Sequence, residues 1–346
     1  MDRIEKQWLQ RLSQGPLSVY ALLDSQDASL PEFFHLLQRW LQQGLVRLEH
    51  GRVALTEQGQ ALARQLGVFY EPVRCPHCQG TGYVLGPRLE QVYQRYLALT
   101  RERPRVKAEY DQGFIDPLGV MRRVAFMYER GDLTDTQIFI VGDDDLLSLA
   151  AALTGLPRRI MVMDIDQDLI AFIQRMAAAH QLPIEARVID VQYALPEDLQ
   201  GQFDVFVTDP VETLPGIELF LSRGASALRG VGSAGYFGLT TLEASRRKWY
   251  RIQSMLLQMG FVITDIRRQF NVYPDTEGNF FAFQDKLPIV QHLGVPTDHD
   301  WYRSAFYRIE AVEPPRPAVT GTRILDDAVY RDEESWATPH YGTSAE

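Results

Sequence analysis

The stretch IFIVGDDDLLSLAAALTG, from Ile138 to Gly155, decides the fold. An apolar segment typical of a buried strand leads into a turn that begins at Gly142, and an Ala- and Leu-rich helical segment follows. This order is typical of the first strand, turn and helix of dinucleotide-binding and S-adenosylmethionine-binding domains, where glycines let the backbone approach the ligand. Here the turn instead carries three consecutive carboxylates, Asp143, Asp144 and Asp145. The turn therefore predicts a known fold with an unusual ligand.

Further apolar segments follow this stretch, and they alternate with segments that have the period of helices. Continuous apolar strands that alternate with helices predict a parallel, doubly wound sheet. A late strand pair with a long hairpin-like connection predicts an antiparallel edge. We therefore expect an α/β domain of the class I S-adenosylmethionine type (Rossmann-like) over residues 106–318. The predicted strands cover residues 137–142, 159–165, 184–190, 203–209, 233–239, 261–270 and 304–312, and the predicted helices include 146–155, 167–180 and 241–260.

Residues 1–70 predict a separate, small α+β domain of the winged-helix type. Three helical segments precede a hairpin that turns at His50 and Gly51, and a last helix is capped by Thr56. This order is common in DNA-binding regulators. Residues 1–70 nevertheless contain seven Lys and Arg against seven Asp and Glu, whereas a DNA-binding surface is normally basic. We therefore expect dimerisation or docking from this domain rather than nucleic-acid binding.

Residues 71–105 are predicted to connect the two domains, and they contain the two cysteines of the chain, Cys75 and Cys78. A Cys-x-x-Cys pair followed by glycines is half of a tetrahedral zinc site, and the sequence has no second pair. The two cysteines are candidate ligands of a zinc ion shared between two chains, a redox pair, or the remnant of a lost site. We assign no metal from this pattern.

The whole composition is that of a globular protein, and its negative charge is compatible with partners of positive charge or with a role in solubility alone. With 346 residues and 45% hydrophobic content, the chain is long enough for two domains. It has no apolar run near the roughly 18–20 residues that span a bilayer and no signal-peptide core, so we expect a cytoplasmic protein without membrane contact. The net charge of -10 argues against polyanionic partners. Part of this charge lies in residues 319–346, an acidic tail that we expect to be mobile.

Acidic residues stand at the ends of four consecutive predicted strands, where ligands of such sheets bind. A carboxylate at the end of the second strand, Asp164, can accept both ribose hydroxyls of an adenosine, and Asp190 after the third can accept from the adenine amino group. Each acid has an alternative interpretation as a helix N-cap or a solvated loop end, but the ordered set favours an adenosine site. The predicted donor-binding residues are Gly142, Asp143, Asp144, Asp164, Asp166, Asp190 and Val191.

The other acids, in the Gly142 turn and at Asp209 and Glu212 after the fourth strand, exceed what an adenosine needs. Carboxylates a few ångströms apart destabilise one another by several kcal/mol unless cations are present or some are protonated. S-Adenosylmethionine would add its own carboxylate, whereas its decarboxylated form offers a sulfonium and a primary ammonium. The charges therefore favour the decarboxylated donor and a polycationic acceptor such as a polyamine.

The segments IFIVGDDDLLSLA, VMDIDQDLI, VIDV and VTDPVET, in this order, resemble the aminopropyltransferases, and more closely the branched-chain polyamine synthases. The resemblance covers most of the chain, including the N-terminal domain and the CPHC segment. It implies transfer of aminopropyl groups from decarboxylated S-adenosylmethionine to the internal N4 nitrogen of spermidine, which gives N4-aminopropylspermidine and then N4-bis(aminopropyl)spermidine, with 5′-methylthioadenosine as coproduct. It also implies no cofactor beyond this co-substrate, spermidine and other polyamines as partners, a homodimer and a thermophilic source.

The resemblance also implies roles for single residues. In the wider family the acid at the position of Asp145 holds the donor ammonium, those at Asp164 and Asp190 hold the ribose and the adenine, and that at Asp209 handles the attacking amine. This chain departs from the linear enzymes, because the two residues before Asp145 replace glycines and Asp-Pro-Val-Glu replaces a different acidic turn. The division between base and binding residue therefore stays open.

We assign catalysis to three acids, with Asp209 or Asp145 as the base and Glu212 as an anchor for the amine. Aromatic and polar residues ahead of the sheet and on its fifth strand are candidates for polyamine binding, although a capped loop and core packing are the alternative interpretations. These candidates are Tyr110, Asp111, Gln112 and Tyr236.

Two other functions are compatible with the pattern. One is a methyltransferase that uses intact S-adenosylmethionine, which the three aspartates disfavour. The other is a regulator whose winged helix binds DNA and whose Rossmann-like domain senses a metabolite, which the neutral charge of residues 1–70 disfavours.

Overall fold

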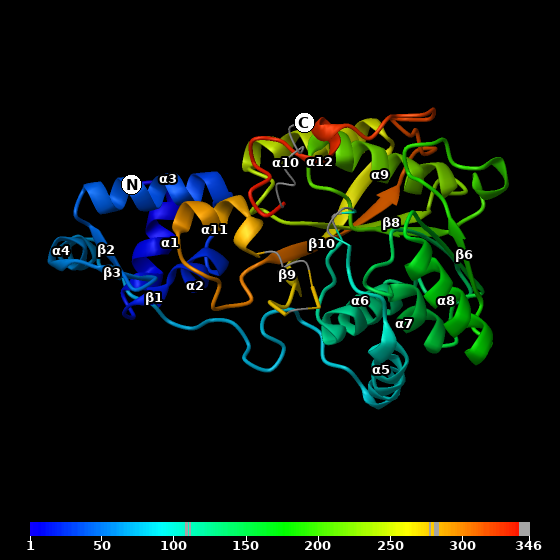
Figure 1. The fold of residues 1–346 in the computed structure, drawn as a ribbon, viewed down its shortest axis with the longest axis horizontal. Helices are drawn as coiled ribbons and strands as arrows, with labels where there is room; N and C mark the ends of the chain where they lie inside the picture. The colour runs from blue at the N-terminus through cyan, green and yellow to red at the C-terminus, as the bar shows by residue number, and fades with distance from the viewer. Residues whose placement is uncertain (108–109, 111, 277, 280–283, 339–346) are drawn as a thin grey trace, which may run out of the picture.

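The computed structural model describes residues 1–107, 110, 112–276, 278–279 and 284–338. Its larger domain is built on a seven-stranded sheet with the order β6-β5-β4-β7-β8-β10-β9 (Figure 1). Strands β4 to β8 run parallel, whereas β10 is antiparallel to both β8 and β9. The predicted doubly wound sheet with an antiparallel edge is therefore confirmed. The strands are β4 (Gln137–Val141), β5 (Arg159–Asp164), β6 (Ile184–Val188), β7 (Val205–Thr208), β8 (Ala234–Leu239), β9 (Phe261–Val272) and β10 (Arg303–Ala311).

Helices cover both faces of this sheet, because both faces of its central strands are apolar. Ile138 and Ile140 of β4 belong to the core formed with α6, α7 and α8, whereas Phe139 and Val141 pack with α9 and α10. Figure 1 shows these two helix layers on opposite sides of the sheet. The helices of this domain are α5 (Pro87–Leu99), α6 (Pro117–Glu129), α7 (Leu147–Leu153), α8 (Gln167–His180), α9 (Leu214–Ala227), α10 (Arg246–Gln258), α11 (Pro288–Leu293) and α12 (Asp327–Tyr330).

The N-terminal residues form the small α+β unit that the sequence predicts. Its three-stranded sheet has the order β1-β3-β2, and the β2–β3 hairpin turns at His50 and Gly51, whose φ angles are +49° and +73°. Trp8, Phe33 and Trp40 pack together in its core. Assignment of this unit to the winged-helix class stays a prediction. Its elements are α1 (Arg3–Leu12), β1 (Leu17–Ser18), α2 (Val19–Asp24), α3 (Leu30–Gln42), β2 (Val46–Glu49), β3 (Arg52–Leu55) and α4 (Glu57–Gln65).

The described part of the acidic tail is packed rather than extended into solvent. Arg223 of α9 donates to the carbonyl oxygens of Val319 and Gly321, at 2.9 and 2.8 Å. Thr213 donates to the carbonyl oxygen of Val329. In Figure 1 this red segment passes α12 and returns towards α11. The mobility expected of the tail stays a prediction, and residues 339–346 lie outside the described part of the chain.

An acidic residue of the N-terminal domain joins the two domains. Asp27 is 8% exposed and pairs with Arg3 of its own domain and with Arg246 and Arg268 of the sheet domain. Although burial opposes ionisation, hydrogen bonds from Arg268 and Arg3 hold the pKa of Asp27 far below its usual value. The carboxylate therefore stabilises the contact between the domains.

Replacement of Asp27 by Asn should lower the free energy of unfolding by about 1–3 kcal/mol at neutral pH, because three arginines lose their ion pairs with this buried carboxylate. The folded-state pKa of Asp27 lies below its unfolded value, so this stabilisation is complete above pH of about 4 and is lost as the pH falls towards the folded-state pKa. The difference between wild type and variant should therefore shrink in acid. Denaturant unfolding at several pH values, followed by circular dichroism, measures it.

The matched control is Glu313→Gln, which removes an ion pair between two exposed side chains. Such pairs contribute about 0–1 kcal/mol, so the control should unfold almost like wild type. Equal stability of Asp27→Asn and wild type at neutral pH would contradict the assignment.

Candidate active site

One cavity opens at the carboxyl ends of the parallel strands, where the sequence analysis placed the ligand. It extends from the turns after β4, β5 and β6 to the turn after β7, the loop after β8 and the tail. The first half is lined by Gly142, Asp144, Asp164, Ile165, Asp190 and Val191. The second half is lined by Asp209, Glu212, Glu243, Tyr273, Tyr302 and Ala337.

The turn after β4 bends at Gly142, whose φ of +75° favours glycine. Asp143 follows it and is 2% exposed. Its carboxylate accepts a hydrogen bond from the Ser148 N–H at 3.3 Å, near the start of α7. Burial raises the pKa of Asp143 to about 8, although the hydrogen bonds from Ser148 oppose this shift. Asp143 therefore stabilises the helix start and lines a small second cavity beneath the turn rather than the main one.

Asp144 lines both the main cavity and the small second cavity. Its Oδ2 accepts from the Gly113 N–H at 2.8 Å, and Arg103 donates to its carbonyl oxygen. Burial, and then repulsion from Asp209, raise the pKa of Asp144 to about 7. A cation that enters beside it would therefore displace a proton near neutral pH.

A buried arginine that the sequence analysis missed, Arg123 of α6, stands behind two of the predicted catalytic acids. Its side chain is 1% exposed. Its Nη1 lies 2.6 Å from Asp209 Oδ2 and its Nη2 lies 3.1 Å from Asp209 Oδ1, and Nη1 is 3.0 Å from Asp145 Oδ2. This two-point contact fixes the plane of the Asp209 carboxylate. A signal was available, because an arginine inside the apolar run VMRRVAFM must find a carboxylate if it is buried.

The two acids predicted as bases occupy different positions. Asp209 has a side chain that is 24% exposed and lines the main cavity. Asp145 is 3% exposed, faces Arg123 and accepts from the Ile115 N–H at 2.7 Å, and it lines the small second cavity. Burial, and then repulsion from Asp209, raise the pKa of Asp145 despite the opposing charge of Arg123. Of the two, Asp209 is the one placed to meet a ligand in the main cavity.

Backbone N–H groups hold the predicted ribose-binding acid. Asp164 accepts from the Asp166 N–H at 2.8 Å and from the Asp143 N–H at 3.2 Å. Asp166 itself does not line the cavity, since it caps α8 and pairs with Lys107 at 2.6 Å. Although burial opposes the shift, hydrogen bonds from Lys107 and Gln112 lower the pKa of Asp166.

The segment before α6 reaches the cavity with two of its predicted residues. Tyr110 and Gln112 both line it. The Gln112 side chain donates to Asp166 at 3.2 Å and accepts from the Lys107 N–H at 2.7 Å, which ties the segment to the turn after β5. Asp111, the third predicted residue of this segment, lies outside the described residues.

Glu212 is paired with an acid that the sequence analysis did not find, Glu243. The Tyr302 hydroxyl lies 3.0 Å from Glu212 Oε2 and 2.8 Å from Glu243 Oε2. Because a phenol has one proton, it donates to one of these carboxylates at a time. Burial, and then repulsion from Glu243, raise the pKa of Glu212. Lys248 bonds the carbonyl oxygens of both glutamates, at 3.2 and 2.6 Å. The two carboxyl groups therefore form an acidic end of the cavity.

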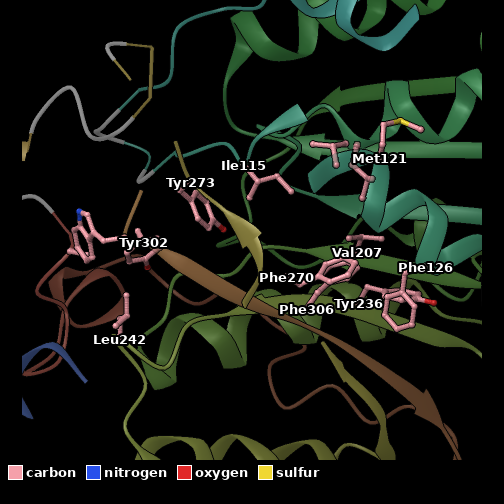
Figure 2. Packing of buried hydrophobic residues seen from close by; sticks show 14 of the residues in the cluster. Ile115, Met121, Phe126, Val207, Tyr236, Leu242, Phe270, Tyr273, Tyr302 and Phe306 are labelled. Atoms are coloured by element: carbon pink, nitrogen blue, oxygen red, sulfur yellow. The ribbon is translucent and has the colours of Figure 1, made fainter. Parts of the chain in front are cut away.

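Tyr236 is not at this site, which removes the structural basis for its predicted contact with a polyamine. Figure 2 shows it in the core beside Phe126 and Phe306, apart from Tyr273 and Tyr302. Its ring centroid lies 5.7 Å from that of Phe126 and 5.4 Å from that of Phe306. Its position in the middle of β8 explains this, because the cavity lies beyond the ends of the strands.

Cys75 is exposed and Cys78 is buried, and neither lines the cavity. The Gly82 N–H lies 3.4 Å from Cys78 Sγ, an interaction that contributes to a lowered pKa of this thiol. Within the described ranges, no group of three or more His, Cys, Asp and Glu residues is arranged to hold a metal ion. The three interpretations of the cysteine pair therefore stay open.

In the part of the chain that the structure describes, none of the helices combines the length and the apolar character that crossing a bilayer requires.

The sheet order is that of the class I S-adenosylmethionine-type (Rossmann-like) fold, and the acids at its carboxyl edge form the candidate site. Comparison with known proteins is more specific. Residues 91–337 match the family model described as the branched-chain polyamine synthase A C-terminal domain. The chain belongs to the branched-chain polyamine synthase family.

Relatives cover nearly the whole chain. The N(4)-bis(aminopropyl)spermidine synthase of Thermococcus kodakarensis is 35% identical over 336 residues, which are 94% of this chain and 92% of the relative. That of Thermus thermophilus is 39% identical over 295 residues, or 84% and 81% of the two chains. A crystal structure of the branched-chain polyamine synthase from Thermus thermophilus, in complex with N4-aminopropylspermidine and 5′-methylthioadenosine, aligns with a TM-score of 0.85 at 33% identity and covers 96% of this chain and 92% of that one.

Gly238 of β8 makes the position of the Asp209 carboxylate possible, and its replacement tests that geometry. A Cβ at this position would lie 2.0 Å from Asp209 Oδ1. Gly238→Ala should therefore push the carboxylate out of the Arg123 contact and lower kcat by about 100-fold or more, the scale of a 1 Å misplacement. Steady-state kinetics beside a thermal unfolding curve measures both effects.

Gly86→Ala is the matched control, because a Cβ there meets no atom within 4 Å. The control should keep wild-type kinetics. Full activity of Gly238→Ala would show that the Asp209 carboxylate is not needed in the position described.

Proposed function

We propose that this protein transfers aminopropyl groups from decarboxylated S-adenosylmethionine to the internal N4 nitrogen of spermidine, first giving N4-aminopropylspermidine and then N4-bis(aminopropyl)spermidine. One observation carries the proposal: carboxylates line both halves of the cavity, and no Lys or Arg is among the described residues that line it. Two cationic substrates without carboxyl groups match this lining. The ligands named for the structure from Thermus thermophilus, a branched polyamine and the thioether coproduct, support the same assignment.

The first half of the cavity suits the donor. Asp164 is oriented by two backbone N–H groups, which leaves its outer lone pairs for ribose hydroxyls. Asp190 lies in the turn after β6, beside the apolar side chains of Ile189 and Val191, where an adenine ring would fit. Asp144 lies between these residues and Asp209 in the order of the sheet, and we assign it the donor ammonium.

The second half suits the acceptor. Glu212 and Glu243 are close enough to share the hydroxyl of Tyr302, and one ammonium between them would relieve their mutual repulsion. Tyr273 and Tyr302 line the same half and would provide aromatic rings for the ammonium groups of a polyamine and the methylenes beside them. We propose that this end holds an outer ammonium of spermidine and leaves N4 near Asp209.

The chemistry needs no covalent intermediate on the protein. The N4 lone pair attacks the aminopropyl carbon next to sulfur, the C–S bond breaks, and its electron pair stays on sulfur as the thioether of 5′-methylthioadenosine. In the first transfer the new ammonium at N4 releases a proton, and we propose that Asp209 accepts it or passes it to water. In the second transfer a tertiary amine becomes quaternary, so no proton is released.

Asp209 is the better candidate for the base, because its carboxylate lines the main cavity, whereas Asp145 lines only the small second cavity. Neither alternative function has such support. A methyltransferase would place the carboxylate of S-adenosylmethionine against Asp144 without a cavity-lining cation in the described part of the chain.

Incubation with decarboxylated S-adenosylmethionine and spermidine should yield polyamines heavier by one and then two aminopropyl units, together with 5′-methylthioadenosine. Mass spectrometry of the products measures this. Asp209→Asn should lower kcat by about 100-fold or more, as expected for loss of a general base, whereas Asp135→Asn, at an exposed position, should not. Methyl transfer from intact S-adenosylmethionine, without aminopropyl transfer, would overturn the proposal.

Donor affinity should rise with pH, because Asp144, the acid assigned to the donor ammonium, lines the main cavity and its pKa is raised to about 7. Below this pKa the Asp144 carboxyl group is protonated, and a cationic donor must displace the proton on binding. Release of one proton from a group with a pKa of 7 strengthens binding about tenfold between pH 6 and pH 8. Calorimetry in buffers of different ionisation enthalpy measures both the affinity and the proton release.

The neutral coproduct 5′-methylthioadenosine is the control ligand, because it has no charge to displace a proton. Its affinity should change little over this range. An equal pH dependence for both ligands, or none for the donor, would contradict the assignment of the donor ammonium to this turn.

A further inference from the structure

The N-terminal domain contacts the acceptor half of the cavity through the first residue of α3. The Leu30 N–H donates to the carbonyl oxygen of Leu242 at 2.7 Å, and both residues are buried. Leu242 precedes Glu243 in the loop after β8. The same loop carries Thr240, whose N–H donates to Glu212 at 2.7 Å. A backbone hydrogen bond from the N-terminal domain therefore fixes the loop that positions both acids.

A second contact from α3 reaches the C-terminal tail. The Trp336 ring stacks on His292 of α11 at 4.4 Å between centroids, and Phe34 of α3 lies 5.8 Å from Trp336 and 5.2 Å from His292. The Ile289 N–H donates to the Trp336 carbonyl oxygen at 3.1 Å. Figure 1 shows α11 beside α3. Aromatic rings at such distances attract one another beyond the effect of the area that they bury, so this cluster holds the tail in one place.

Trp336 does not line the cavity, but its neighbours in the sequence do. Ser335, Ala337 and Thr338 form part of the cavity wall. The Ala337 N–H donates to Glu243 Oε1 at 2.7 Å. Because Ala337 follows Trp336 directly, release of the indole would withdraw this N–H from Glu243 and remove part of the wall.

We infer that the N-terminal domain supports the acceptor end of the active site, with Phe34 and Trp336 as positioning residues that hold Ala337 against Glu243. The inference rests on the proposed function, in which Glu243 helps to anchor the polyamine. It gives residues 1–70, whose charges balance, an intramolecular role. The inference also predicts that loss of this contact weakens the binding of spermidine and not of the donor. The proposed donor-binding residues follow β4, β5 and β6, which lie apart from β8 in the sheet order.

Phe34→Ala and Trp336→Ala in the full chain test the inference. Each variant should raise KM for spermidine by about tenfold, the effect of losing roughly 1.4 kcal/mol, with KM for the decarboxylated donor within about twofold of wild type. Trp336→Phe should restore most of the loss, because it keeps an aromatic ring on His292. The double variant should be no worse than either single one, since both remove the same contact.

Gln38→Ala is the matched control, at an exposed position of the same helix one turn beyond Phe34, and it should behave as wild type. Limited proteolysis gives a readout that does not depend on activity: both alanine variants should be cut in residues 331–338 more readily than the control. Wild-type resistance and an unchanged KM for spermidine in Phe34→Ala would overturn the inference, as would equal rises in KM for both substrates. If wild-type protein transfers no aminopropyl group, the proposed function fails, and the proteolysis result alone decides whether α3 holds the tail.

Discussion

Buried carboxylates repel one another and lose their hydration, so a protein that gathers them must supply cations or keep some of them protonated. This constraint organises the site. Arg123 and Lys248 supply positive charge within the protein matrix, where they bond Asp209, Asp145 and the backbone around Glu243. The carboxylates that face the main cavity have raised pKa values at Asp144, Asp164 and Glu212, in each case with burial as the largest cause. A cationic ligand would stabilise the ionised form of these acids, so the charge of the site favours cationic substrates.

The fold places these charges in a useful order. Because β4, β7 and β8 are neighbours in the sheet, the turn proposed to bind the donor, Asp209 and the loop of Glu243 follow one another along its edge. Elements from both ends of the chain then close the second half: Leu30 of the N-terminal domain holds the loop after β8, and Ala337 of the tail bonds Glu243. The part of the site that binds the proposed acceptor is thus assembled from three distant segments, whereas the proposed donor half comes mostly from consecutive strand ends.

That difference explains what the sequence could predict. All seven strands, the antiparallel edge and the line of acids after β4 to β7 follow from local patterns of apolar residues, because strand ends on one edge must meet. Arg123 was missed since it lies on α6, before the first strand, and its partners are known only once the helix is packed. Glu243 falls in the predicted helix 241–260, whereas α10 begins only at Arg246 and leaves Glu243 in the loop before it. Only the long-range contacts of Tyr302 and Ala337 give this glutamate a role. Tyr236 was misplaced although its mid-strand position indicated the core. The contact of Trp336 with His292 joins distant segments, and the acidity of the tail gives no indication of it.

The same negative charge that attracts a polyamine also opposes its reaction, because carboxylates stabilise the protonated amine and an ammonium has no lone pair to attack with. The arrangement of charges resolves this conflict. At the two ends, Asp144 and the pair of Glu212 and Glu243 line the cavity, and no Lys or Arg is among the described residues that line it, so ammonium groups are favoured there. In the middle, Arg123 contacts Asp209 through two nitrogens and offsets its charge, so the protonated form of a nearby amine gains less. The proposed polyamine binding at the ends and the proposed deprotonation at N4 are therefore compatible in one acidic cavity, because Arg123 offsets the charge of Asp209 between them.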